Sequence, residues 1–575
     1  MNNGTAFLLI LLIGLILIGI SGQKQKREQQ IKLNKGLKEN FGVSRNGREI
    51  SISRMEQIPE FFRRHPRPGQ LDDITAKDLE LDKIFQSVNH TCSMVGEEFL
   101  YYCLRSPALS PKEQIYTPEQ LDFFETHEKE RLSLQLVLTR LGYAGNYSLY
   151  SYLDALLELK DLSSAKDYLS NACLVLSFLT LFLNPKIGVL LLIAALVFDF
   201  VTYFTEKRKI EPYLECFFYI RRLIDAADKF STSEGLPFPE EQKRLKEINP
   251  EFNVFRRQLY TLAAGTGNSA DVLLDYLRIL FHLDLICFHR LHCVIAQKKE
   301  LLDEMMTILG KADAAIAVAS YRKSLPCGYC VPSFVSGSGA GSDLPTASCL
   351  YEVKGLYHPS LSAPVRNDIR TTGGILLTGA NASGKSTFLK AAALAAVMAQ
   401  SVWTVCAEEY HADYFRVITS MSVQDDLSEG YSYYMAEVSS MLRILKAREE
   451  VGAPVLSFVD EVLKGTNTIE RIAAAAYILK SFRDPALAGT GISFAATHDR
   501  ELTELLPAYY ENYHFEETAE EGDRIFFSYQ LKQGVSSTRN AIRLLKAFGY
   551  PDEIVRGAFS RVDYFNKNGE WGNPL

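Results

Sequence analysis

Apolar residues are most concentrated at the start of the chain. The stretch Gly4–Gly22 contains no charged residue and is rich in Leu and Ile. An α-helix rises about 1.5 Å per residue, so about 19 residues cross the roughly 30 Å of bilayer hydrocarbon. The segment starts Met-Asn-Asn and ends Ile-Ser-Gly-Gln, so it lacks the basic start and the small-residue cleavage site of a secretory signal peptide. We therefore predict a retained transmembrane anchor over residues 1–23.

A second apolar block, Leu169–Phe204, is broken once, at Asn184-Pro185-Lys186. Two apolar helices joined by a proline turn predict a transmembrane hairpin over residues 169–204 that returns to the side it left. Basic residues follow both predicted membrane segments, within 24–27 and 207–209, and the positive-inside rule then places the rest of the chain in the cytoplasm. The short arms and Asp199 also fit a helical hairpin buried in a soluble domain, which stays as the alternative.

Helical periodicity dominates the chain on both sides of this hairpin. Residues 24–70 are predicted to be a polar linker, residues 71–168 the first part of a helical core, and residues 205–333 its second part, with long lever helices. In the second part, apolar residues recur at intervals of three and four, as in an amphipathic helix; examples are Leu273, Leu274, Leu277, Leu280 and Leu283.

The pattern changes after the Ser- and Gly-rich segment 334–343. Short apolar runs, including Val455–Val459 and Ile492–Ala496, alternate with helical stretches through residues 345–565. This alternation is typical of an α/β domain with a parallel sheet. We therefore expect an α/β domain at the C-terminus, preceded by an all-α region.

The segment Gly379–Ser386 has the spacing G-x-x-x-x-G-K-[ST] of a phosphate-binding loop. Two leucines end an apolar strand before it, and the Ala- and Leu-rich helix Phe388–Met398 follows. In such a loop the glycines turn backbone N–H groups toward the phosphates, Lys385 reaches the β- and γ-phosphates, and the Ser386 hydroxyl binds Mg²⁺. The motif predicts that the chain binds a nucleoside triphosphate.

Two further apolar strands end in residues that suit hydrolysis. Asp460 and Glu461 follow the first strand, and His498 follows the second. Asp460 would hold Mg²⁺ through water, and Glu461 would orient and deprotonate the attacking water. The His498 imidazole can hydrogen-bond the γ-phosphate or that water; a structural histidine at the end of a strand is the alternative.

The order of these elements is itself informative. The phosphate-binding loop is followed by a Gly-x-Ser loop within Asp425–Glu437, the Asp-Glu strand, Lys464-Gly465-Thr466 and Thr497-His498. This set resembles the ATPase domain of the MutS DNA mismatch-repair family, which is close to the ABC-type ATPases. The resemblance is specific from about Gly355 to Pro551 and looser over residues 71–320.

The resemblance implies a P-loop NTPase fold and a Mg²⁺-dependent ATPase. Carried over position by position, it gives Glu461, His498 and Lys385 as catalytic residues, and Ser386 and Asp460 as the residues at the metal. The loop residues implied to contact ATP are Gly379, Ala380, Asn381, Ala382, Ser383, Gly384, Lys385, Ser386 and Thr387.

The resemblance also implies a partner. Gly430 and Ser432 match the family's signature loop, which completes the ATP site of the opposite subunit. Three stretches look like the family's C-terminal dimer-facing segment: Tyr513–Phe515, Gly534–Ser537 and Phe548–Pro551. We therefore expect a homodimer that forms through the ATPase domains when ATP is bound, because the shared phosphate adds contacts that the nucleotide-free dimer lacks.

The chain departs from the family pattern at several places. Lys464 stands where the family usually has Arg, and Tyr433-Tyr434 replace its usual Thr-Phe, which leaves the turnover rate open. Helical similarity begins near Leu71, so we expect no mismatch-recognition or connector domain. The net charge of −7, from 62 basic and 69 acidic residues, does not favour a nucleic-acid surface. The close pair Cys327 and Cys330 lacks a second pair at zinc spacing.

Three functions remain open at this point. The first is a membrane-anchored MutS-like ATPase with three membrane spans, whose ATP cycle moves lever helices. The second is a membrane-tethered repair ATPase that binds mismatched or damaged DNA, which rests on the family alone. The third is a component of an ABC-like transporter, for which three predicted spans are few.

Overall fold

The computed structural model describes most of the chain. The residues it describes are 24, 27–45, 50–159, 164–263, 277–335, 349–379, 383–421, 433–450, 452–464, 466–484, 491–519, 525–535, 542, 545–546 and 549–571. The predicted N-terminal anchor lies outside them. So do five of the predicted site residues: Ala380, Asn381, Ala382, Gly430 and Ser432.

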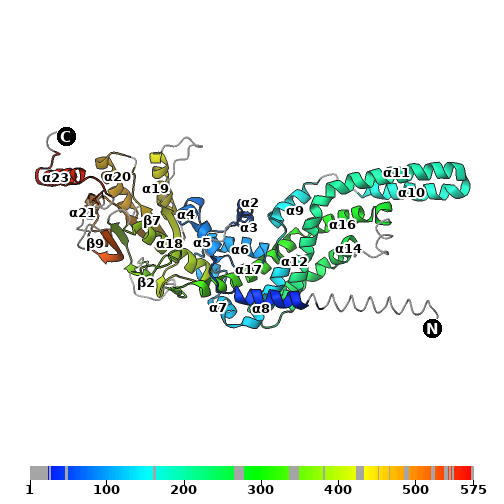
Figure 1. Cartoon of the computed structure of the whole chain (residues 1–575), viewed down its shortest axis with the longest axis horizontal. Coiled ribbons are helices and arrows are strands. Elements are labelled where there is room, and N and C mark those ends of the chain that lie inside the picture. The colour runs from blue at the N-terminus through cyan, green and yellow to red at the C-terminus, as the bar shows by residue number, and fades with distance from the viewer. Residues whose placement is uncertain are drawn as a thin grey trace. The chain divides into compact units, whose positions relative to one another are not determined.

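The chain folds as two compact units that interleave along the sequence (Figure 1). The first unit comprises Met1–His65, Val88–Tyr102 and Glu119–Lys323, and the second comprises Pro66–Ser87, Cys103–Pro118 and Ser324–Leu575. Two short segments, 66–87 and 103–118, therefore belong with the predicted ATPase domain. The boundaries predicted from the sequence instead place these residues in the linker (24–70) and in the first part of the helical core (71–168).

In its described residues, the first unit is helical. Its helices are α2 (Ile52–Met55), α3 (Glu60–Arg64), α6 (Met94–Arg105), α7 (Pro118–Thr126), α8 (Glu128–Leu141), α9 (Leu149–Leu157), α10 (Ala165–Leu183), α11 (Pro185–Ile210), α12 (Leu214–Thr232), α13 (Pro239–Ile248), α14 (Asn253–Ala263), α16 (Leu283–Gln297) and α17 (Lys299–Ser324), with short 3-10 turns at Glu211–Tyr213 and Asn249–Phe252. This agrees with the helical periodicity of the sequence.

Helices α6 and α17 meet closely in the core of the first unit. The buried Asp313 of α17 accepts hydrogen bonds from the backbone N–H groups of Cys92 and Ser93, at 3.0 and 2.8 Å, at the start of α6. A Cβ atom at Gly96 would lie 2.1 Å from Asp313 Oδ2, so α6 requires glycine there. Burial raises the pKa of Asp313 to about 6. One carboxylate thus joins segments 221 residues apart in sequence.

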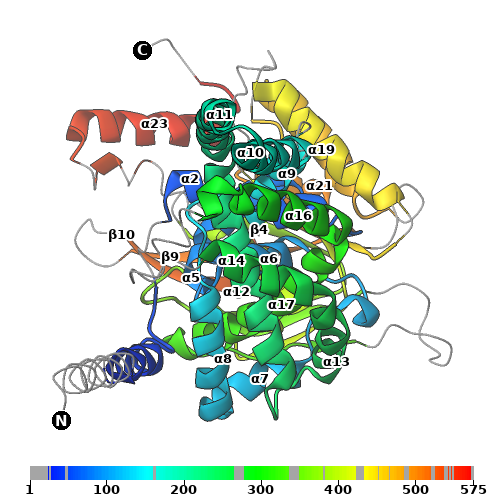
Figure 2. The same cartoon turned by 90° about the vertical axis from the view of Figure 1, so that its right-hand side faces the viewer.

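Helices α10 and α11 form a long hairpin, in which the two helices lie side by side (Figures 1 and 2). The Asn184 side chain accepts a hydrogen bond from the N–H of Ile187 and so caps α11. A Cβ atom at Gly188 would lie 2.6 Å from the Leu181 backbone, so glycine allows the close approach of the two helices. The helices are joined where the sequence predicts a turn, at residues 184–186.

Most of the hairpin surface is apolar and exposed. In the described chain, two helical stretches, Ala165–Leu183 and Pro185–Thr232, are long and apolar enough to cross a membrane, and their most apolar windows have mean hydropathies of 1.2 and 2.4. Only 22% and 17% of their most apolar windows are buried. Most apolar side chains of the two helices are therefore not covered by described residues.

A buried polar cluster holds the base of the hairpin. His282, just before α16, has a left-handed backbone (φ 50°), and its Nδ1 lies 2.9 Å from Asp167 Oδ1. Its Nε2 lies 3.2 Å from Asp199 Oδ1, and the Ser170 hydroxyl donates to the same carboxylate at 2.8 Å. Burial acts against protonation of His282, but the hydrogen bond to Asp167 and the charge of Asp199 outweigh it and raise its pKa. Asp199, which would be costly in a membrane if it were unpaired, therefore has two polar partners.

The second unit contains two sheets. The larger has the strand order β10-β9-β4-β8-β7-β6, parallel except for β10, and the smaller has the order β1-β5-β2-β3. The strands are β1 (Ser333–Phe334), β2 (Tyr351–Leu356), β3 (Asn367–Thr371), β4 (Gly374–Thr378), β5 (Glu409–Ala412), β6 (Arg416–Ser420), β7 (Val455–Asp460), β8 (Gly491–Ala496), β9 (Tyr510–Ala519) and β10 (Ile525–Gln533). The expected α/β alternation is present.

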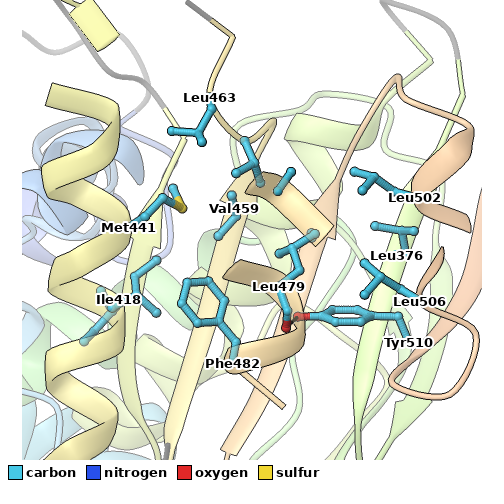
Figure 3. Packing of buried hydrophobic residues seen from close by; sticks show 14 of the residues in the cluster. Leu376, Ile418, Met441, Val459, Leu463, Leu479, Phe482, Leu502, Leu506 and Tyr510 are labelled. Carbon is cyan, nitrogen blue, oxygen red and sulfur yellow. Dashed lines mark hydrogen bonds between the residues drawn. The ribbon is translucent and has the colours of Figure 1, made fainter. Parts of the chain in front are cut away.

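The described residues of the second unit also form helices. They are α4 (Asp73–Asp78), α5 (Leu81–Val88), α18 (Lys385–Val402), α19 (Tyr433–Glu449), α20 (Thr468–Ser481), α21 (Glu501–Leu505) and α23 (Asp552–Asn568), with a 3-10 turn at Pro111–Glu113. Figure 3 shows the core between strands and helices, where Leu376 lies beside Leu502 and Leu506. Burying one such side chain stabilises the fold by about 1.5–3 kcal/mol. This core fixes the ends of β4, β7 and β8, where the candidate site residues follow.

Candidate nucleotide-binding site

The two glycines that bound the loop after β4 both have positive φ angles. The φ angles of Gly379 and Gly384 are 141° and 106°, which side chains with a Cβ rarely adopt. A Cβ atom at Gly384 would lie 3.3 Å from the ring of Tyr529. Helix α18 begins at Lys385, three residues earlier than the predicted Phe388, so its N-terminal end opens directly from the loop.

Lys385 lies inside this turn. Its side chain is buried, and Nζ donates a hydrogen bond to the Gly379 carbonyl oxygen at 2.7 Å. Nζ also lies 3.5 Å from His498 Nε2. The Lys385 ammonium therefore lies between the loop and the end of β8, where it could bind an anion held by the loop.

The acid Glu461 and His498 are in direct contact. Glu461 follows β7, has a left-handed backbone (φ 62°) and donates its N–H to the Ala496 carbonyl oxygen at 2.9 Å. Its carboxylate lies 3.0 Å from His498 Nε2 and 3.3 Å from Lys464 Nζ. A non-glycine residue held at positive φ stores backbone strain, which is common at functional sites. The two strand ends that the sequence singled out are thus brought together.

The charge of Glu461 is stabilised by these neighbours. Burial raises its pKa, but the hydrogen bonds and charges of His498 and Lys464 outweigh burial and lower the pKa to about 2. Glu461 is therefore a carboxylate at neutral pH. It is a weak proton acceptor while His498 and Lys464 hydrogen-bond to it.

One cavity of about 620 Å³ joins these elements. It is large enough for a small-molecule ligand. The predicted site residues that line it are Ser383, Gly384, Lys385, Ser386, Thr387, Asp460, Glu461 and His498. Gly379 contacts the site through its carbonyl oxygen on Lys385.

The cavity offers a donor set that suits Mg²⁺. The Ser386 hydroxyl and the Asp460 carboxylate both face it, and Mg²⁺ prefers a few protein oxygens together with water and phosphate. In the described part of the chain, no cluster of three His, Cys, Asp or Glu residues could hold a metal ion by itself. The residues present therefore fit a metal that a nucleotide helps to bind.

The cavity is also lined by residues that the sequence did not identify as site residues. Tyr529 has a left-handed backbone (φ 54°) within β10, and Asn367 holds this irregular part of the strand by hydrogen bonds to the Tyr529 carbonyl oxygen (3.0 Å) and the Leu531 N–H (2.7 Å). His358 also lines the cavity, and burial together with the nearby Lys390 lowers its pKa to about 4. No local motif marks Tyr529, because its position depends on a long-range contact with β3.

Comparison with known proteins identifies the second unit. The family model for MutS domain V matches residues 375–566. Three relatives carry the name DNA mismatch repair protein MutS. The protein of Caldicellulosiruptor bescii is 32% identical over 188 residues, which are 32% of this chain and 21% of the relative. That of Thermotoga petrophila is 29% identical over 289 residues, 48% of this chain and 33% of the relative. That of Thermus aquaticus is 28% identical over 325 residues, 54% of this chain and 36% of the relative.

Over residues 375–566 the chain is similar to MutS domain V. Its match to MutS domain V begins within β4, includes Lys385, Glu461 and His498, and ends in α23. The predicted resemblance is thereby confirmed. The matched stretches span about a fifth to about a third of the length of these MutS relatives.

Proposed function

We propose that this chain is a Mg²⁺-dependent ATPase of the MutS family. The observation that supports it best is the single cavity that joins the loop lysine Lys385 to the Glu461–His498 pair, on the three strand ends inside the domain V match. Lys385 and the N-terminal end of α18 would bind the phosphates. Ser386 and Asp460 would hold the metal, which neutralises the charge that develops on the phosphate oxygens.

Hydrolysis would be carried by Glu461. Water forms a bond to the γ-phosphorus while the bond to the β–γ bridging oxygen breaks, and the proton of that water goes to the Glu461 carboxylate. A bound γ-phosphate would compete for His498 and Lys464, which lie on Glu461 without nucleotide. Losing its contacts with His498 and Lys464 would raise the pKa of Glu461 from about 2, which makes the carboxylate a better proton acceptor. His498 would thus couple binding of the γ-phosphate to the pKa of Glu461.

The proposal includes a homodimer. Gly430 and Ser432 lie outside the described residues, in the segment between β6 and α19. By the family pattern they would complete the ATP site of a second copy, so that two ATPase domains close when ATP is bound. The proposal keeps the predicted anchor at 1–23 and the ATPase domain at 345–565, and adds segments 66–87 and 103–118 to the ATPase unit.

The α10–α11 hairpin is proposed to lie in a membrane, which makes the protein a multi-pass membrane protein with its ATPase domain in the cytoplasm. The supporting observation is the exposed apolar surface on both helices, together with the pairing of Asp199 at their base. Lipid would cover side chains that no described residue covers. In this arrangement the ATP cycle would move the helical unit relative to the membrane.

A titration of ATPase activity with DNA tests the proposed function and its alternative. The detergent-solubilised full chain is expected to hydrolyse ATP at a rate that duplex, mismatched and single-stranded DNA do not change. Stimulation by DNA that weakens from low to high salt would instead reveal a surface that contacts phosphates, and would support a repair function like the one named for the relatives. Absence of hydrolysis with Mg²⁺ present would refute the ATPase proposal.

Quenching by brominated lipid tests the hairpin. Leu176→Trp in α10 and Leu190→Trp in α11 replace side chains that are 61% and 70% exposed. In vesicles with bromine on the acyl chains, fluorescence of both variants is expected to be quenched relative to unlabelled vesicles. Ile52→Trp, at an 81% exposed position of α2, is the matched control, and the native Trp403 and Trp571 give a constant background. Equal quenching at all three positions would contradict membrane insertion of the hairpin.

A further inference from the structure

The surface of the hairpin changes character abruptly at its base. Exposed apolar side chains run from Leu169 to Leu183 on α10 and from Ile187 to Phe204 on α11, which is roughly 20–25 Å along each helix. Beyond these limits the exposed residues are polar or charged: Lys166 lies before the apolar stretch of α10, and residues 205–209 follow that of α11. The boundary lies at the same end of both helices because they are antiparallel.

Basic residues from three elements gather at this boundary. Lys166 belongs to the first turn of α10, residues 207–209 to the last turn of α11, and Arg290 to α16. Contacts place two of these residues, Arg290 and Lys207, beside the ends of the apolar stretches. Arg290 donates to the Tyr168 hydroxyl at 2.9 Å, and Lys207 Nζ lies 3.6 Å from Asp284, whose carboxylate also accepts from the Tyr203 hydroxyl.

Part of this charge is available to a ligand. Lys207 is paired with Asp284, and Lys209 with Glu206 at 2.8 Å. Lys166, Arg208 and Arg290 are exposed, and none of them pairs with a carboxylate of the described chain. Tyr168 is 48% exposed beside Arg290, and tyrosine is enriched where hydrocarbon meets the headgroups.

We propose that Lys166, Arg208 and Arg290 form a binding site for the phosphate groups of anionic phospholipids at the base of the hairpin. The inference rests on the proposed insertion of the hairpin and names the lipid class that it meets. With the apolar stretches in hydrocarbon, these three cations lie at headgroup depth, where each basic residue strengthens association with anionic lipid. The buried His282 cluster keeps α10, α11 and the start of α16 together, so that residues from all three elements face the same headgroups.

Native mass spectrometry of the full chain in detergent tests this site. The chain is titrated with phosphatidylglycerol or phosphatidylcholine, and the expected result is tighter binding of phosphatidylglycerol. Lys166→Gln/Arg208→Gln should weaken binding of phosphatidylglycerol by roughly 10- to 30-fold and leave phosphatidylcholine unchanged. Lys243→Gln/Lys246→Gln, two exposed lysines of α13, makes the same change in charge in the same unit and should behave like the wild type.

Each other outcome overturns the proposal. Equal affinity of the wild type for the two lipids, or an equal loss in both double variants, would show that the site has no headgroup specificity. Competition by inorganic phosphate at the level of the free lipid would assign the site to a soluble anion. Binding of duplex DNA that is lost only in Lys166→Gln/Arg208→Gln would assign it to nucleic acid. Failure of hairpin insertion is seen separately in the bromine quenching, and failure of the ATPase in the hydrolysis assay.

Discussion

Replacing Glu461 with Gln is expected to preserve ATP binding and to lower the rate of ATP hydrolysis by roughly 100- to 1000-fold. The amide has nearly the same shape as the carboxylate and can still accept a hydrogen bond from His498, which lies 3.0 Å away. It cannot accept the proton of the attacking water. The variant should therefore hold ATP without turning it over, and a dimer that forms with ATP should accumulate. Single-turnover hydrolysis and sedimentation with ATP measure the two effects.

A matched control separates chemistry from a general effect of removing a charge. Glu470→Gln makes the same change at an exposed position in the first turn of α20, outside the cavity. Its hydrolysis rate should stay within about twofold of the wild type, as is usual for surface substitutions. Similar rates for wild type and Glu461→Gln would remove Glu461 from the proposed role. Loss of ATP binding in Glu461→Gln would show that the acid is needed for the fold of the cavity.

Local patterns in the sequence were sufficient for the elements that carry the site. An apolar run that ends in Asp460 and Glu461 predicts β7, and the structure ends that strand at Asp460. The glycine spacing predicts a loop between β4 and α18, and both end glycines have positive φ angles. The helical hairpin could also be predicted from local sequence, because two apolar runs joined by a short proline turn form two antiparallel helices. These features depend on neighbours within a few residues.

The remaining features depend on contacts between distant segments. The buried Asp78 of α4 accepts hydrogen bonds from the Thr419 hydroxyl (2.7 Å) and the Met421 N–H (2.8 Å), and thereby attaches segment 66–87 to the edge strand β6. Nothing in the sequence near Asp78 indicates that partner, because it lies 341 residues away. The place of Tyr529 in the cavity, held through Asn367, escaped prediction for the same reason. Hydrophobic periodicity indicates which face of a helix or strand is buried, but it does not indicate which other element packs against that face.

The hairpin shows a third limit of sequence reasoning. Asp199 in an apolar helix favoured a buried soluble hairpin, since an unpaired acid in hydrocarbon costs about 2.5–3.5 kcal/mol or more. The structure pairs it with Ser170 and His282, and it is almost fully buried. A charge that is already paired no longer argues against a membrane. The sequence around Asp199 could not indicate this pairing, because His282 lies more than 80 residues further along the chain.

Replacing Lys385 with Ala is expected to abolish nucleotide binding, with a dissociation constant for ATP raised at least roughly 100-fold. Charge-assisted hydrogen bonds to a phosphate contribute about 1.5–3 kcal/mol each, and Lys385 would make more than one. The side chain is buried against the Gly379 carbonyl oxygen, so the loop also loses the group that closes it. Equilibrium binding of a fluorescent ATP analogue measures the loss, and the hydrolysis rate should fall with it.

Two further variants make this result interpretable. Lys385→Met keeps the length of the side chain without its charge, so it should bind ATP as poorly as Lys385→Ala while filling the same space. Lys446→Ala removes an exposed lysine from α19 and should bind ATP like the wild type. Recovery of binding in Lys385→Met would assign the effect of Lys385→Ala to a lost packing contact. Full ATP affinity in both Lys385 variants, with unchanged thermal unfolding, would mean that the cavity is not the nucleotide site. The ATP affinity of the Lys385 variants thus tests whether this cavity is a phosphate-binding site.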